Sequence, residues 1–175
     1  NTSFSINDLS ADALVPLGLR DDDGNSSDVS ELMPNVTDGP YLGGGGLYSN
    51  VGDYMKFMRM VLQNGQGPDS EILPSGMVRD MFANQIGDMQ VGYMPSQNPM
   101  LAKSHGWFEG TSMKWGYGLM VNATEVAGRR SAGAGAWSGL YNTFFSIDPA
   151  RDTACVVMMQ ILPVYNEAAL AVFDT

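Results

Sequence analysis

The part of this sequence that most restricts its fold is the stretch of residues 130–160. An aromatic run begins at Thr143, the turn-forming residues 148–152 follow it, and an apolar run rich in valine comes after the turn. Aromatic and β-branched residues favour strands, whereas Asp and Pro favour turns. This order predicts a β-hairpin with one strand on each side of residues 148–152.

A stretch of small residues precedes this hairpin and is followed by Trp137, Ser138 and Gly139. Glycine inside a strand lowers stability, and it often marks the close approach of a ligand or of another backbone. One interpretation makes this edge a wall of an active site. The other makes Trp137 a core residue and lets Gly135 and Gly139 form a β-bulge. The residues by themselves leave both interpretations open.

Two helices are predicted in the middle of the chain. Asn50 or Ser49 can cap the first helix, and Asp53 favours its positively polarised N-terminal end. Its apolar residues recur at helical spacing, at Tyr54, Phe57, Met58, Val61 and Leu62. The second helix is shorter and begins at Pro74 or Ser75.

Farther along, residues 115–121 alternate large and small side chains and predict a strand, and residues 165–173 predict a final helix. Helices in the middle and at the end, with strands mainly in the second half, predict an α/β (α+β) sandwich in which helices flank an antiparallel sheet. In this arrangement residues 1–42 form an irregular covering segment and residues 43–113 a helical segment with a loop. Residues 114–175 hold the sheet strands and the final helix.

The composition limits the partners that this chain can bind. It has 19 Asp and Glu residues against 9 Lys and Arg residues, for a net charge of -10. Without a basic patch, nucleic acid and anionic membrane surfaces are excluded as expected partners. No apolar run reaches the length of about 18 residues that a membrane span requires, so we expect no span.

Single His and Cys residues restrict the chemistry further. His105 is the only histidine, so no site with two histidine ligands can form, and we expect neither a metal nor another cofactor. Cys155 lies in an apolar run and is predicted to be a buried small residue. Neither a G-x-S-x-G nor an S-x-x-K motif occurs, and a Ser-His-Asp triad would depend on His105 alone, in a loop. The chain therefore holds no complete serine-hydrolase site.

Five stretches, taken in order, nevertheless resemble a known family: GGGGLYSNVGDY at 43–54, LQNG at 62–65, ILP at 72–74, WGYGL at 115–119 and the hairpin at 141–160. Together they resemble the serine β-lactamase family, in the branch of class C β-lactamases and family VIII carboxylesterases. The resemblance implies the β-lactamase/transpeptidase-like fold. It also implies that residues 1–175 are the C-terminal portion of one such domain.

The resemblance also assigns the active-site wall. Counting back from the hairpin turn, Trp137, Ser138 and Gly139 take the place of the family's third motif, usually K-T-G or H-x-G. W-x-G is similar to the carboxylesterase branch, and tryptophan offers an apolar wall in place of a lysine charge. The resemblance thus implies that Trp137, Ser138 and Gly139 bind substrate. It further implies that the backbone amide of Leu140 is one of two oxyanion-hole donors.

The family's other motifs, S-x-x-K and Y-x-N, would lie upstream. Tyr48-Ser49-Asn50 matches Y-x-N literally, but its place is that of a helix start, and we interpret it as structural. We therefore expect the C-terminal portion of a serine hydrolase that cleaves carboxylic esters through an acyl-enzyme and is inactive without its N-terminal portion.

The expected partners are a small-molecule ester or amide and the N-terminal portion of the same protein. The bacterial cytoplasm or periplasm is the expected compartment. The alternatives are a β-lactamase or D-amino-acid peptidase, and a non-catalytic binding or structural module.

Overall fold

The structure is a computed structural model that describes residues 1–37, 39–108 and 110–173. Its larger sheet is antiparallel, with the strand order β3-β4-β5-β6-β7. These strands are β3 (Met113–Trp115), β4 (Met120–Asn122), β5 (Gly135–Gly139), β6 (Thr143–Asp148) and β7 (Thr153–Val157). The smaller sheet has the order β2-β1-β8 and is formed by β1 (Gly18–Arg20), β2 (Ser26–Asp28) and β8 (Ile161–Leu162).

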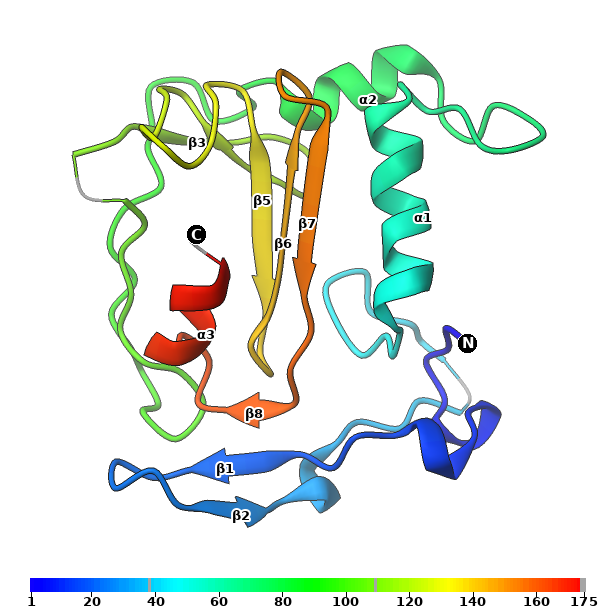
Figure 1. Ribbon diagram of the computed structural model, residues 1–175, viewed down its shortest axis with the longest axis vertical. Coiled ribbons are helices and arrows are strands. Elements are labelled where there is room, and N and C mark those ends of the chain that lie inside the picture. Colours follow the sequence, from blue (N-terminus) through cyan, green and yellow to red (C-terminus); the bar gives the residue numbers. More distant parts are fainter. Residues whose placement is uncertain (38, 109, 174–175) are drawn as a thin grey trace.

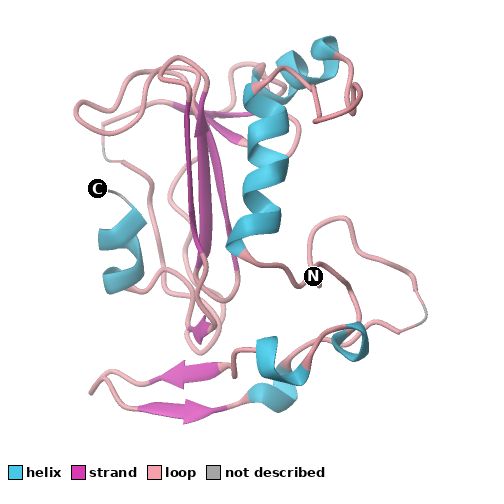
Figure 2. Ribbon diagram, turned by 45° about the vertical axis from the view of Figure 1, so that its right-hand side comes forward, coloured by secondary structure: helices cyan, strands magenta, loops and turns pink. Residues whose placement is uncertain are grey.

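Helices cover both faces of the larger sheet, as Figures 1 and 2 show. The α-helices are α1 (Val51–Leu62), α2 (Ser75–Phe82) and α3 (Glu167–Phe173), and α1 and α3 lie on opposite sides of the sheet. Three short 3-10 helices, η1 (Ile6–Asp8), η2 (Ala11–Ala13) and η3 (Ser30–Leu32), belong to the N-terminal segment. The predicted fold class, an antiparallel sheet flanked by helices, is confirmed.

The core is divided by the sheet into two clusters. Successive side chains of a strand point to opposite faces, so Phe144 packs in the cluster under α3 while Ile147 packs in the cluster under α1. Phe173 of α3 stacks on Phe144 with ring centroids 5.2 Å apart. The guanidinium of Arg130 lies 4.5 Å from the ring centre of Phe173 and helps to hold α3 on the sheet.

The predicted hairpin of β6 and β7 is present, and Asp148 organises its turn. The carboxylate of Asp148 is buried and accepts hydrogen bonds from the backbone N–H groups of Ala150 (3.1 Å) and Arg151 (3.2 Å). A second oxygen accepts from the N–H of Ser131 at 2.9 Å. One side chain thus fixes the β6–β7 turn and ties it to the segment that enters β5.

Helix α1 begins where the sequence predicts it, at the cap residue Asn50. The Asn50 side chain accepts a hydrogen bond from the Asp53 N–H at 3.0 Å. Tyr54, one turn into the helix, packs edge-on against Phe145 of the sheet with ring centroids 5.3 Å apart. Burial raises the pKa of Tyr54 to about 12.

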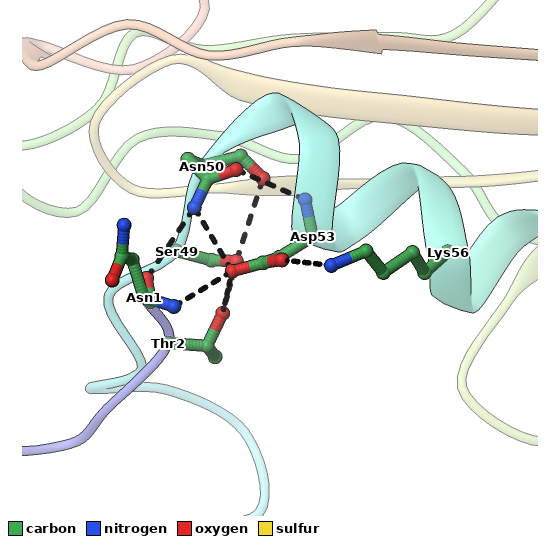
Figure 3. Close-up of polar contacts among 6 residues, drawn as sticks. All are labelled: Asn1, Thr2, Ser49, Asn50, Asp53 and Lys56. Atoms are coloured by element: carbon green, nitrogen blue, oxygen red, sulfur yellow. Dashed lines mark hydrogen bonds and ion pairs between the residues drawn. The ribbon is translucent and has the colours of Figure 1, made fainter.

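Asp53 joins the N-terminal segment to α1, as Figure 3 shows. Its carboxylate accepts from Lys56 at 2.6 Å, from the backbone nitrogen of Asn1 at 3.0 Å and from the Thr2 hydroxyl at 3.2 Å. Hydrogen bonds from Lys56 above all, and from the Asn50 amide, hold the pKa of Asp53 well below its usual range. The start of α1 is therefore a junction of charge-assisted contacts at the surface.

Two expectations about the sheet are wrong. Residues 115–121 are not one strand, because β3 and β4 are separated by a turn in which the Gly116 N–H donates to the Leu119 carbonyl at 2.8 Å. Gly118 has a φ of 77°, which glycine adopts easily. Cys155 is exposed rather than buried, since its neighbours Ala154 and Val156 occupy the positions of β7 that face α1.

Candidate active site

The candidate site is the part of β5 that lacks a neighbour on one side. β4 pairs with β5 only at Gly135 and Ala136, whereas β6 pairs with β5 along its whole length. In the described part of the chain, Trp137, Ser138 and Gly139 therefore have strand pairing on one side only. The β5–β6 register runs without interruption from Gly135 to Gly139, so the β-bulge interpretation is wrong.

The two glycines at the ends of β5 have different surroundings. A Cβ atom on Gly135 would lie 2.8 Å from side-chain atoms of both Phe82 and Leu119. Gly135 is thus required by the packing of α2 against the sheet. A Cβ on Gly139 would meet the Cβ of Thr143 at 3.5 Å, an ordinary contact, so the described residues supply no packing reason for Gly139.

Trp137 is half-buried and held by other aromatic rings. Its ring packs edge-on against Trp115, with centroids 4.4 Å apart and an interplanar angle of 84°, and lies 6.4 Å from the ring of Trp107. Edge-to-face contacts of this kind are a favoured arrangement of aromatic pairs. Trp137 therefore combines features of both interpretations, because it packs against the core and is not fully buried.

The Ser138 side chain is engaged within the protein. Ser138 lies opposite Phe144, on the sheet face that α3 covers, and its hydroxyl oxygen is 3.3 Å from that of Tyr165. The Tyr165 ring stacks on His105 with centroids 4.3 Å apart and an interplanar angle of 12°. His105 is thus part of an aromatic stack and half-buried, and the binding of substrate by Ser138 stays a prediction.

Leu140 follows β5 directly and opens the turn to β6. Its side chain is 46% exposed, so the chain is not anchored here by burial of this residue. The assignment of its backbone amide as an oxyanion donor stays a prediction. The position of this amide therefore depends on the contacts of the neighbouring residues in the turn.

Asn142, which sequence reasoning missed, anchors that turn. It is completely buried with a φ of 60°, and its side-chain amide donates to the carbonyls of Ile161 (2.8 Å) and Pro163 (2.9 Å). Its side-chain oxygen accepts from the N–H of Asn166 at 3.0 Å. The available signal was its place directly before the aromatic run that begins at Thr143, because asparagine tolerates a positive φ in turns.

The literal Y-x-N match has a structural role. The Tyr48 hydroxyl donates to the Pro34 carbonyl at 2.7 Å, and the Tyr48 backbone pairs with Ser3. Burial, and secondarily the nearby Tyr141, raise the pKa of Tyr48, which disfavours the anionic form that a base requires. Asn50 of the same match is the cap of α1.

The candidate site is an exposed edge rather than a closed cavity. A groove of about 650 Å³ lies elsewhere, between the β1–β2 hairpin and residues 96–104, and no residue of β5 lines it. Over residues 1–37, 39–108 and 110–173, no cluster of His, Cys, Asp or Glu side chains is arranged to hold a metal ion. In the same residues, no helix has the length and apolar character of a membrane span.

Comparison with known proteins identifies the family. The family profile described as Beta-lactamase matches residues 10–172 of this chain. The chain belongs to the β-lactamase family. This agrees with the motifs at 43–54, 115–119 and 141–160, which carry the resemblance in the sequence.

Two curated relatives from Mycobacterium tuberculosis are similar over most of the chain. They are Protein Rv1367c of strain H37Rv and the uncharacterized protein MT1414 of strain CDC 1551, each 29% identical over 150 residues. The match covers 79% of this chain and 34% of each relative. This β-lactamase-family chain thus spans about a third of the length of the curated relatives it matches.

Solved structures of simvastatin synthase (LovD) from Aspergillus terreus share the fold. A LovD6 mutant matches with a TM-score of 0.76 at 18% identity, over 99% of this chain and 44% of that chain. The unliganded selenomethionyl form matches with a TM-score of 0.70 at 20% identity, again over 99% of this chain and 44% of the other. At this identity the likeness supports the β-lactamase/transpeptidase-like fold.

The two glycines of β5 provide a first test of the site geometry. We expect Gly135→Ala to lower the free energy of unfolding by about 1–3 kcal/mol, because the added methyl group overpacks the contact with Phe82 and Leu119. The matched change Gly139→Ala should stay within about 0.5 kcal/mol. Urea unfolding of both variants measures the difference, and equal losses would show that Gly139 is also a packing residue.

Asn142 provides a second test. Asn142→Asp keeps the shape but directs a carboxylate oxygen at the carbonyls of Ile161 and Pro163, so we expect a loss of at least about 2 kcal/mol at neutral pH. Such a carboxyl has a raised pKa in the folded state, since its protonated form can still donate. The loss should therefore shrink as pH falls through that raised pKa.

The control for this change is Asn98→Asp. Asn98 is exposed, and its side-chain oxygen accepts from the Met100 N–H, a contact that aspartate retains. Denaturation at neutral and at acidic pH compares the two variants. A pH-independent or negligible loss for Asn142→Asp would contradict the anchoring role of Asn142.

Proposed function

We propose that this chain is the C-terminal part of a serine hydrolase that cleaves carboxylic esters through an acyl-enzyme. The observation that carries the proposal is the open edge of β5 at Trp137, Ser138 and Gly139, in a chain of the β-lactamase family. The family's third motif is expected at this edge. The share of each relative that the chain covers leaves room for the nucleophile in an N-terminal portion.

The proposed reaction uses this edge as one wall of the site. The serine oxygen supplied by the N-terminal portion attacks the ester carbonyl, and its proton passes to a neighbouring base. The carbonyl oxygen becomes negatively charged and accepts a hydrogen bond from the Leu140 N–H, with a second donor from outside this chain. The alcohol leaves with a proton, and water then attacks the acyl-serine and releases the carboxylic acid.

Trp137 supports esters over β-lactams as substrates. A lysine at this position would pair with the carboxylate that β-lactams carry, whereas an indole ring cannot. The ring that Trp115 holds in place offers an apolar surface to an acyl or alcohol group instead. β-Lactam or D-alanyl hydrolysis is therefore the second candidate activity, and it is tested beside the ester.

The decisive assay uses the full-length protein and a short-chain nitrophenyl ester. We expect turnover that a serine-directed inhibitor abolishes, and no turnover by the present chain alone. Nitrocefin and a D-alanyl peptide serve as competing substrates, and an alcohol can be added as an acceptor because the fold neighbours are synthases by name. Absence of an upstream S-x-x-K motif, together with no turnover, would replace the proposal by a non-catalytic binding role.

Trp137→Lys tests the origin of the substrate preference. In the full-length protein we expect the ratio of nitrocefin to ester kcat/KM to rise about tenfold, the effect of one additional charge-assisted contact of about 1.5 kcal/mol. The control Trp137→Leu removes the ring without adding a charge, and it should lower ester turnover without raising nitrocefin turnover. An unchanged ratio of nitrocefin to ester kcat/KM in the lysine variant would show that Trp137 does not determine the substrate preference.

A further inference from the structure

One short segment lies behind the β5–β6 turn and bonds to residues on both sides of Leu140. In residues 161–166, the Ile161 N–H donates to the Tyr141 carbonyl at 3.2 Å. The same segment supplies all three partners of the Asn142 side chain. On the other side of Leu140, the hydroxyls of Ser138 and Tyr165 lie 3.3 Å apart.

This segment is itself fixed from its far side. The Val164 N–H donates to the Leu101 carbonyl at 2.9 Å, and the Val164 carbonyl accepts from the Lys103 N–H at 3.0 Å. Its first residues form β8, which pairs with β1. The segment can therefore support the turn, because its first residues and Val164 are bonded to two other parts of the chain.

Tyr165 holds an unusual conformation within this support. Its φ is 66°, a region that non-glycine residues other than Asn, Asp and His seldom occupy. The ring is held by stacking on His105 and by an edge contact with Trp107 at 6.0 Å. These contacts direct the Tyr165 hydroxyl to Ser138.

We propose that Tyr165 is a positioning residue for the Leu140 amide, acting through Ser138. This inference rests on the proposed function for its catalytic consequence. An oxyanion donor is effective only when it is held about 2.7–3.1 Å from the developing charge. Asn142 fixes the turn after Leu140, and the Tyr165 hydroxyl fixes the strand residue two positions before it.

The first experiment measures ester turnover by the full-length protein. Tyr165→Phe removes only the hydroxyl and keeps the stack on His105. We expect kcat to fall about 5- to 20-fold with KM within about twofold, because a displaced donor weakens transition-state binding. Ser138→Ala should give a similar loss, and the double variant no further loss, since both remove the same contact.

The matched control is Tyr54→Phe, a half-buried tyrosine on the opposite face of the sheet. It should leave kcat unchanged. An unchanged kcat in Tyr165→Phe, or a double variant whose losses multiply, would overturn the inference. A failure of the wild-type protein to hydrolyse any ester would count against the proposed function alone.

The second experiment does not depend on turnover. Hydrogen exchange of the full-length protein, followed in peptides that cover residues 138–142, should become several-fold faster in Tyr165→Phe and in Ser138→Ala, but not in Tyr54→Phe. Faster exchange supports the positioning of the turn even in a protein without esterase activity. Unchanged exchange at this turn would overturn it.

Discussion

The candidate site depends on where β4 begins. The β3–β4 hairpin turns back at Gly116 because the backbone there lies against α2: a Cβ on this residue would come 1.9 Å from the Met81 carbonyl oxygen. β4 therefore begins at Met120 and pairs with β5 only as far as Ala136. Beyond Ala136, the described part of β5 has no strand partner on this side, and alternate residues of such an edge direct their N–H and C=O groups outward, an arrangement that suits an extended ligand or a reacting carbonyl.

Elements defined by local signals were predictable from the sequence. Asn50 caps α1 where the polar-to-apolar change indicates it, and Asp148 makes the turn that its Asp-Pro sequence indicates. The strands β6 and β7 follow from aromatic and β-branched runs. In each case the deciding interactions are within a few residues along the chain, so a single sequence contains them.

Features defined by distant contacts were not predictable in this way. The WGYGL stretch alternates like a strand, and only the approach of α2 makes it a turn. In the sequence, Asn142 is indistinguishable from an ordinary turn residue, because its hydrogen-bond partners lie about 20 residues farther along the chain. The position of α1 likewise decides which residues of β7 are covered and which are exposed. The apolar residues around Cys155 do not indicate in the sequence which face that helix covers.

The parallel pairing of β1 with β8 has a consequence for the order of folding. Gly18 is aligned with Ile161, so this contact joins residues near the two ends of the described chain. Closing so long a loop is entropically unfavourable until the intervening chain is compact, and contacts of this kind form slowly. The hairpins of the larger sheet are local and can form early. Because β8 is part of residues 161–166, we expect this segment to reach its final place after the local hairpins, and assembly of the site edge to be a late event in folding.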